Sequence, residues 1–303
     1  MSARSVGKKN KVSLKSKVEP YLYLAPFAIG VLLFTLYPIV NVVLMSFKEN
    51  YNFINQSYSG WGLGNYLYVL KDAYFIQAYK NTFMYVFVVI PISTCLSVVI
   101  ATLLNQKIKF SGMFQTAYFL PMVTSTIAIG FAWRFMFNHK TGIINYLLSF
   151  FGVEAINWLQ IPKYNFPALC IYGVWAILPF TIILLLSGLQ NIDPMYYTAA
   201  KVDGAGPIKS FFRITLPLLA PTIFLVLCVN TISTFKVYNE LFPLFQGPGI
   251  ASNLFTVVYY IYYQFRIKTP SKYGYAAAAA VILFLTIFVF TMIQRFVEKL
   301  TKD

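Results

Sequence analysis

Long apolar runs alternate with short polar segments along almost the whole chain. Six runs hold about 20 residues or more, the length that an α-helix needs to cross the hydrocarbon core of a bilayer. They lie at about residues 21–47, 81–104, 113–137, 166–189, 218–237 and 276–296. The pattern therefore predicts an all-α membrane protein with six transmembrane helices and both termini on the same side.

Composition agrees with a membrane protein and argues against a nucleic-acid-binding one. Of the 303 residues, 58% are hydrophobic and only 11% are charged, whereas a soluble domain carries about 25% charged residues. The net charge of +15 is not gathered in a basic domain. More than half of the 24 Lys and Arg residues fall in the two terminal tails, the link around Lys107 and the stretch between the fourth and fifth runs. Because basic loops stay on the cytoplasmic side, we expect these segments and both termini in the cytoplasm.

Two parts of the chain are expected. Residues 1–19 are basic and poor in apolar side chains, which predicts a cytoplasmic tail that touches anionic lipid. Residues 20–303 are expected to form a single six-span domain. The first apolar run is too long for a signal-peptide core and has no convincing cleavage site, so we interpret it as a retained membrane helix.

Several predicted spans contain proline. A proline removes an amide donor and leaves the carbonyl four residues earlier without its helical partner. Inside a membrane, such kinks are tolerated where protein or water satisfies the freed carbonyl. They suit a transport pathway, although they also serve helix packing. These residues are Pro26, Pro38, Pro91, Pro121 and Pro179.

The stretch 191–214, between the fourth and fifth runs, is amphipathic and basic. Asp193 is placed to cap a helix that begins at Pro194, where the missing amide of proline costs nothing. The apolar positions that recur at helical spacing are Met195, Ala199 and Val202. This pattern predicts a short helix with one apolar face.

Two glycines are expected to end that helix. Gly204 and Gly206 adopt the left-handed backbone conformation without a steric penalty. Pro207 is expected to start a second helix, and the apolar residues that follow it are Ile208, Phe211, Phe212, Ile214 and Leu216. The order helix, glycine turn, helix predicts a docking element on one face of the membrane. An ordinary amphipathic helix at the membrane surface is the alternative.

The same stretch resembles a known loop. Ala199-Ala200, then Asp203-Gly204-Ala205, then a Leu216-Pro217 pair that leads into the next span, are similar to the cytoplasmic "EAA" loop of bacterial ABC-importer permease subunits. The family usually has glutamate before the alanine pair, and this chain has Thr198 there. The resemblance implies contact with a partner ATPase through Tyr197, Thr198, Ala199, Ala200, Asp203, Gly204, Ala205, Arg213 and Pro217.

Further motifs resemble the carbohydrate-uptake group of these permeases, which includes those for oligosaccharides and glycerol phosphate. The motifs are Gly62-Leu63-Gly64-Asn65-Tyr66, Asn81-Thr82, Leu120-Pro121 with Trp133 and Phe137-Asn138, residues 235–249, and residues 273–278. The resemblance implies a type I importer permease fold in the bacterial inner (plasma) membrane. It also implies a related partner permease, two cytoplasmic ATPase subunits that bind ATP and Mg²⁺, and an extracytoplasmic solute-binding protein.

The sequence shows no catalytic or nucleotide-binding motif. It has no G-x-x-x-x-G-K-[ST] phosphate loop, no H-E-x-x-H and no G-x-S-x-G. Its one histidine, His139, falls in an expected outer loop. Cys95, Cys170 and Cys228 lie in apolar runs without the spacing of a metal site or a disulfide framework. We therefore expect a non-enzymatic subunit without a metal or cofactor of its own.

The candidate substrate path lies mainly on the fifth span. Sugars need hydrogen-bonding side chains and aromatic walls. Asn230, Thr234 and Tyr238 are spaced to share one helix face, and further candidates are Ser233, Asn239 and Trp175. Hydrogen bonding between helices is the competing use of such residues in membranes.

Ionisable residues are almost absent from the centres of the predicted spans. An ion-coupled carrier usually needs them along its path, so an ATP-driven importer is favoured. The ion-coupled solute carrier remains the alternative function, and a membrane scaffold or assembly factor is a third.

Overall fold

The computed structural model describes residues 14–106, 111–268 and 272–302, and helices dominate these residues. The long helices are α1 (Leu14–Val31), α4 (Ala73–Leu104), α8 (Pro162–Gln190), α11 (Leu216–Thr234) and α14 (Tyr273–Lys302). The shorter ones are α2 (Tyr37–Phe47), α3 (Gly64–Lys71), α5 (Ser111–Val123), α6 (Thr126–Met136), α7 (Ile143–Ser149), α9 (Pro194–Val202), α10 (Pro207–Ser210), α12 (Leu241–Phe245) and α13 (Val257–Tyr262). The predicted all-α class is confirmed.

Shorter elements connect these helices. Within the described residues, three π-helical turns occur, at Leu32–Leu36, Phe211–Thr215 and Tyr263–Ile267, and a 3₁₀ turn covers Ile250–Ser252. Two short strands, β1 (Lys48–Glu49) and β2 (Gly60–Trp61), pair antiparallel with Lys48 opposite Trp61.

Five helical stretches in the described residues are long and apolar enough to cross a membrane. They are Tyr21–Phe47, Ala73–Leu104, Pro162–Gln190, Pro207–Thr234 and Tyr273–Leu300. The second begins earlier than expected, because the carboxylate of Asp72 caps the helix and accepts a hydrogen bond from the amide of Tyr74 at 2.9 Å. Five of the six predicted spans are therefore present as single helical stretches.

The third predicted span is broken. Instead of one helix over 113–137, α5 and α6 meet at a bend of 112°. Ser125, between them, has an extended backbone with ψ of 127°. Pro121 weakens the last turn of α5 because it supplies no amide donor. The pair counts as a sixth span only if both halves together cross the membrane.

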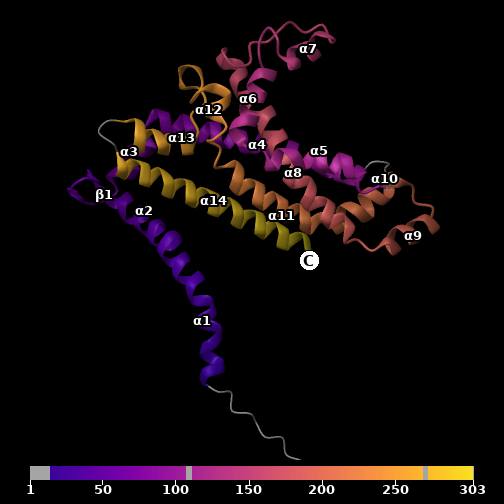
Figure 1. Cartoon of the computed structure of the whole chain (residues 1–303), viewed down its shortest axis with the longest axis horizontal. Coiled ribbons are helices and arrows are strands. Elements are labelled where there is room, and N and C mark those ends of the chain that lie inside the picture. The colour runs from indigo at the N-terminus through magenta and orange to yellow at the C-terminus, as the bar shows by residue number, and fades with distance from the viewer. Residues whose placement is uncertain (1–13, 107–110, 269–271, 303) are drawn as a thin grey trace, which may run out of the picture.

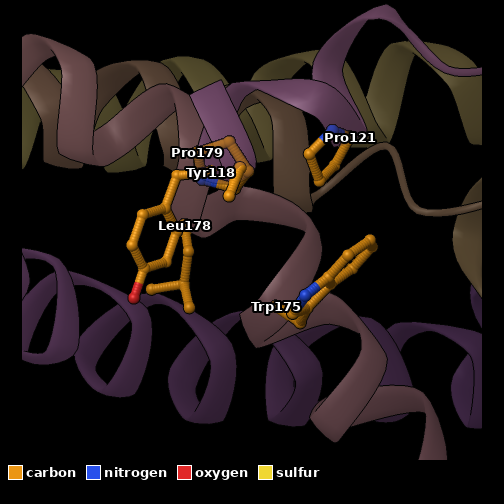
Figure 2. Close-up of a pocket in the computed structure, with 6 residues that line it drawn as sticks. Tyr118, Pro121, Trp175, Leu178 and Pro179 are labelled. Carbon is orange, nitrogen blue, oxygen red and sulfur yellow. The ribbon is translucent and has the colours of Figure 1, made fainter. Parts of the chain in front are cut away.

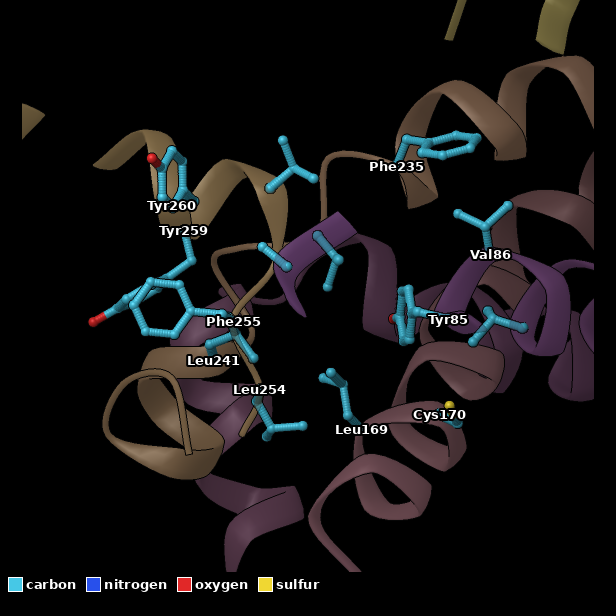
Figure 3. Packing of buried hydrophobic residues seen from close by; sticks show 14 of the residues in the cluster. Tyr85, Val86, Leu169, Cys170, Phe235, Leu241, Leu254, Phe255, Tyr259 and Tyr260 are labelled. Atoms are coloured by element: carbon cyan, nitrogen blue, oxygen red, sulfur yellow. The ribbon is translucent and has the colours of Figure 1, made fainter. Parts of the chain in front are cut away.

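Four long helices, α4, α8, α11 and α14, form the bundle (Figure 1). Small buried residues of α4, among them Ser93, Ser97 and Ala101, let neighbouring helices approach closely. Figure 3 shows part of the larger buried cluster, to which α4 contributes Tyr85 and Val86 and α8 contributes Leu169 and Cys170. This packing fixes the positions of the helices that carry the candidate site.

The N-terminal helix is an arm that leaves the bundle. In its apolar stretch Tyr21–Phe47, the most apolar window has no buried residue. Only the α2 part packs on the bundle, chiefly against α14, while α1 points away from it (Figure 1). Because α1 begins at Leu14, the last residues of the expected tail 1–19 are helical. Residues 1–13 lie outside the described part of the chain.

The two ends of the bundle carry different elements. The strands, α3 and α13 lie at one end, and α9 and α10 lie at the other, toward which the C-terminal end of α14 also runs (Figure 1). Two residues of the motif at 62–66 hold the first end together. The side-chain amide of Asn65 donates to the carbonyls of Ser46 and Lys48, each at 2.9 Å, and the amide of Gly64 donates to the carboxylate of Glu49 at 2.8 Å.

Candidate functional site

The first half of the 191–214 stretch folds as its capping residues predict. The carboxylate of Asp193 accepts a hydrogen bond from the amide of Met195 at 2.8 Å, and Pro194 is the first residue of α9. The helix ends at Val202. Gly204 follows with φ of +70°, and a Cβ built on it meets no atom within 4 Å. This turn therefore depends on a backbone conformation that favours glycine, not on lack of space.

One detail of the prediction is wrong. Gly206 has φ of −69° and ψ of 169°, so it is extended and precedes α10 instead of closing the turn in the left-handed region. The second helix begins at Pro207, as expected. It continues through the π turn at Phe211–Thr215 into α11, as one apolar stretch of 28 residues. The docking element is thus joined directly to the fifth span.

The apolar side chains of this element point mostly into the surroundings. Met195 is 69% exposed, Val202 84%, Ile208 76% and Phe212 61%. Of the coupling residues, Thr198, Ala199, Asp203, Gly204, Arg213 and Pro217 are exposed and Ala205 is partly exposed. An exposed apolar surface of this kind marks a site of contact with another molecule.

Two of the predicted coupling residues are instead buried or bonded within this chain. Ala200 is buried. The hydroxyl of Tyr197 lies 3.1 Å from the hydroxyl of Thr215, at hydrogen-bonding distance. The hydroxyl of Thr198 donates to the carbonyl of Pro194 within its own helix at 3.2 Å, so it reaches no neighbouring element through that bond.

The candidate path residues do not gather in one place. Asn230 is buried, and its side-chain amide donates to the hydroxyl of Thr181 in α8 at 2.9 Å. Thr231 is also buried, and its hydroxyl accepts from the side-chain amide of Gln294 in α14 at 2.8 Å. The hydroxyl of Thr234 is buried without a hydrogen-bond partner in the described structure. These contacts form a polar seam between α8, α11 and α14. They support the competing interpretation of these residues, which is hydrogen bonding between membrane helices.

The predicted common face of Asn230, Thr234 and Tyr238 is wrong beyond Thr234. The helix α11 ends there, and the carbonyl of Val237 instead accepts a hydrogen bond from the hydroxyl of Thr256 at 2.8 Å. Tyr238 therefore leaves the helix before the next turn is completed.

Tyr238 and Asn239 line a cavity of about 650 Å³ between α6 and α12. Ser125, Thr126 and Phe131 of the broken third span form the other wall. Burial raises the pKa of Tyr238, and Tyr262 and Tyr259 add to the rise, so this hydroxyl remains protonated at neutral pH. Ser233 is exposed on α11 and does not belong to the residues that line this cavity.

Trp175 lines a second cavity, of about 320 Å³, between α5 and α8 (Figure 2). Tyr118, Pro121, Leu178 and Pro179 share its wall. Sequence reasoning noted both prolines as kinks but did not bring them together, and it missed Tyr118. The sequence holds one hint of this cavity, because Trp175 lies four residues before Pro179, one helical turn away on the same face.

The segment between α12 and α13 is strained and clamped. Gly249, Ala251 and Ser252 have positive φ angles of 75°, 51° and 60°. The side-chain amide of Asn81, at the start of the second apolar run, donates to the carbonyls of Asn253 at 2.8 Å and Phe255 at 2.9 Å. The Asn81 motif therefore has a structural role here.

In the described residues, no three potential ligands (His, Cys, Asp or Glu) lie together as a metal site.

Comparison with known proteins agrees with this arrangement. The family described as "Binding-protein-dependent transport system inner membrane component" matches residues 75–303. The trehalose/maltose transport system permease protein of Thermococcus litoralis is 32% identical over 97% of this chain and 98% of its own length. The arabinooligosaccharides transport system permease protein of Bacillus subtilis is 33% identical over 92% of this chain and 88% of its own length.

A solved structure has the same fold. It is a bacterial alginate ABC transporter in complex with an alginate pentasaccharide-bound periplasmic protein, and one of its chains superposes with a TM-score of 0.79 at 22% identity. The match covers 96% of this chain and 99% of that chain. The expected importer permease fold is thus confirmed. This chain belongs to the family of inner-membrane components of binding-protein-dependent transport systems.

Proposed function

We propose that this chain and a second, related permease together form the membrane path of an ATP-driven importer for an oligosaccharide or a simpler sugar. An extracytoplasmic binding protein delivers this solute. The observation that carries the proposal is the similarity, along nearly the whole chain, to permeases named for trehalose/maltose and for arabinooligosaccharides. The family assignment does not support the alternative of an ion-coupled carrier.

The exposed face of α9 is the proposed contact with an ATPase subunit. Met195, Val202 and Ile208 present apolar surface around the Gly204 turn. Two ATPase subunits bind and hydrolyse ATP with Mg²⁺, and this chain supplies no ligand to either. ATP binding moves the element formed by α9 and α10, and the direct continuation of α10 into α11 carries the motion into the membrane. The change between inward- and outward-facing states is then a rigid shift between two helix packings.

The cytoplasmic side is proposed to be the end of the bundle that carries α9. The segment there contains Lys201, Lys209 and Arg213, and α14 ends with Arg295 and Lys299 on the way to the same end. Basic segments of this kind are retained in the cytoplasm. The N-terminal tail belongs to the same side in this proposal.

The N-terminal arm supports a second permease as a partner. Within Tyr21–Phe47, Leu22, Phe27 and Phe34 are 67%, 74% and 82% exposed. Such a helix needs an apolar environment along its whole circumference. Lipid and the partner permease together supply it.

Reconstitution tests the function directly. The chain is assembled in proteoliposomes with its partner permease, ATPase subunits and binding protein, and offered maltose, trehalose, lactose and arabinotriose. We expect one of these sugars to stimulate ATP hydrolysis and to accumulate only when ATP is hydrolysed. Uptake that stops when an ion gradient is collapsed, yet continues with hydrolysis blocked, contradicts the proposal. Lack of ATP-driven uptake for any sugar of the panel contradicts the carbohydrate assignment.

A further inference from the structure

A short hairpin, residues 48–61, follows the N-terminal arm directly. The apolar stretch Tyr21–Phe47 ends where β1 begins, and β2 returns beside β1. Just beyond β2, the amide of Gly62 donates to the carbonyl of Phe47 at 2.9 Å. Both sides of the hairpin are thus tied to the last turn of the arm, so the arm sets how deep the hairpin lies in the membrane.

The length of the arm places the base of the hairpin among lipid headgroups. At 1.5 Å per residue, the 27 residues of Tyr21–Phe47 extend over about 40 Å. The hydrocarbon core of a bilayer is about 30 Å thick, and core and headgroup regions together measure about 40–45 Å. An arm that crosses the core therefore ends in the headgroup region, where the hairpin begins.

The tip of the hairpin stays at the same level. The ring of Phe53 lies 5.2 Å from that of Tyr273, the first residue of α14, and α14 is itself long and apolar enough to cross a membrane. The amide of Ile54, next to Phe53, donates to the side-chain oxygen of Asn52 at 2.9 Å, which fixes the turn. Base and tip both lie at the ends of membrane-crossing stretches, so the hairpin runs along the membrane surface and does not rise from it (Figure 1).

The exposed side chains of the hairpin suit this level. Phe53 is 54% exposed, Ile54 93% and Trp61 57%, and the sequence from Asn50 to Trp61 has no charged residue. Tryptophan and tyrosine concentrate at the boundary between membrane and water, because each has an apolar ring and one polar group. A group of exposed apolar side chains marks a surface that another molecule or the membrane covers.

The side chain of Lys48 adds a positive charge to this aromatic surface. Its Nζ lies 5.3, 5.0 and 5.6 Å from three ring centres, which belong to Tyr51, Tyr58 and Trp61. These distances fall within the range of about 6 Å for cation–π contacts. The neighbouring carboxylate of Glu49 is held by the backbone amide that starts α3, at 2.8 Å. A cation surrounded by interfacial aromatic rings is complementary to a lipid phosphate group.

We propose that the hairpin 48–61 is an interfacial membrane anchor. Phe53, Ile54 and Trp61 enter the boundary between headgroups and acyl chains, and Lys48 faces a lipid phosphate. Phospholipid is the occupant, because the hairpin stays level with the ends of the spans and continues the exposed apolar surface of the arm. The anchor holds the end of the arm that packs on the bundle, and this role does not depend on which solute is imported.

Fluorescence quenching tests where the tip lies. Ile54→Cys, at a side chain too exposed to affect the fold, is combined with replacement of Cys95, Cys170 and Cys228 by alanine and labelled with a fluorescent maleimide. The importer is assembled with cysteine-free partner subunits in vesicles of phosphatidylethanolamine and phosphatidylglycerol. Lys140→Cys, at an exposed charged position, is the control. We expect lipids that carry a nitroxide near the headgroup to quench the label at position 54 about twofold more than the label at position 140.

Other occupants give different results. If iodide in the water quenches both labels equally and the nitroxide lipid quenches neither, the hairpin lies in solution. If neither quencher reaches position 54, a protein subunit covers the tip. If the label at position 54 is shielded from iodide only after the solute-binding protein is added, the hairpin is a protein docking site. Each of these results overturns the anchor.

Substitutions then test the side chains that hold the hairpin in the membrane. With the label at position 54, we expect Trp61→Ser and Lys48→Gln each to lower quenching by the nitroxide lipid to about half. For Lys48→Gln, the difference between vesicles with and without phosphatidylglycerol should disappear. Leu147→Ser, at a side chain of α7 that is 54% exposed, is the matched control and should quench as wild type does. Unchanged quenching in both hairpin variants, in complexes that assemble normally on size exclusion, contradicts the proposal.

Discussion

The side-chain amide of Asn230 and the hydroxyl of Thr181 form a 2.9 Å hydrogen bond that joins two membrane helices inside the buried core. Thr181 also donates to the carbonyl of Ile177 in its own helix at 3.0 Å. Asn230 therefore holds α11 against α8 in this structure.

The Asn230→Ala variant tests this bond. We expect a loss of about 0.6 kcal/mol of stability, the average worth of a hydrogen bond between membrane helices, seen as a lower unfolding temperature of the purified complex. Ser233→Ala, an exposed position on the same helix, is the control and should unfold as wild type does. A variant with normal stability but altered choice of sugar would instead return Asn230 to the substrate path.

Gly204 is expected to tolerate no branched side chain. Its φ of +70° lies in the left-handed region, so Gly204→Val costs about 1–3 kcal/mol of local strain, although a Cβ meets no neighbouring atom. We expect α9 to be misplaced and sugar-stimulated ATP hydrolysis to be lost in a complex that is still inserted in the membrane. Gly206→Ala is the matched control, because φ is −69° there. Equal loss in both variants would show that the turn conformation is not the cause.

The exposed face of α9 is expected to bind the ATPase subunit. Val202→Asp places a charge on a side chain that is 84% exposed, so the fold of this chain should not change, while an apolar contact with a partner is lost. We expect the ATPase to copurify poorly with this variant. Ile54→Asp, at a position 93% exposed near the opposite end of the bundle, should copurify with the ATPase as wild type does. Retention of the ATPase by Val202→Asp would place the contact elsewhere.

Asn81 is expected to be needed for the fold of the 246–256 segment. Its side-chain amide makes two hydrogen bonds to that segment, at 2.8 and 2.9 Å, and each contributes about 1 kcal/mol. Asn81→Ala should therefore lower the unfolding temperature and expose the segment to limited proteolysis. Lys80→Ala, at the neighbouring exposed position, serves as control. An unchanged cleavage pattern in Asn81→Ala would mean that the segment holds its positive φ angles without this clamp.

The spans and the coupling turn could be predicted from the sequence because local rules decide them. A lipid environment requires long apolar helices, so run length alone located five of them. At the turn, Asp193, Pro194 and Gly204 each impose a local backbone preference that no distant residue overrides.

Distant contacts decide the features that were mispredicted. The apolar run over 113–137 continues through Thr124 and Ser125, so hydropathy does not reveal the 112° break. The helical spacing from Asn230 to Tyr238 assumes that the helix continues, but it stops at Thr234. Beyond that point, the hydroxyl of Thr256 donates a hydrogen bond to the carbonyl of Val237. The cavity at Trp175 depends on the register between α5 and α8, which no sequence pattern of either helix alone specifies.

The continuous helical stretch from Pro207 to Thr234 determines which helices travel together. At 1.5 Å per residue, its 28 residues extend over about 42 Å, so a tilt of about 5° at one end displaces the other by roughly 4 Å. Hydrogen bonds survive changes of only a few tenths of an ångström. The bonds that join this stretch to Thr181 and Gln294 can persist through a transport cycle only if α8 and α14 swing with it as one block.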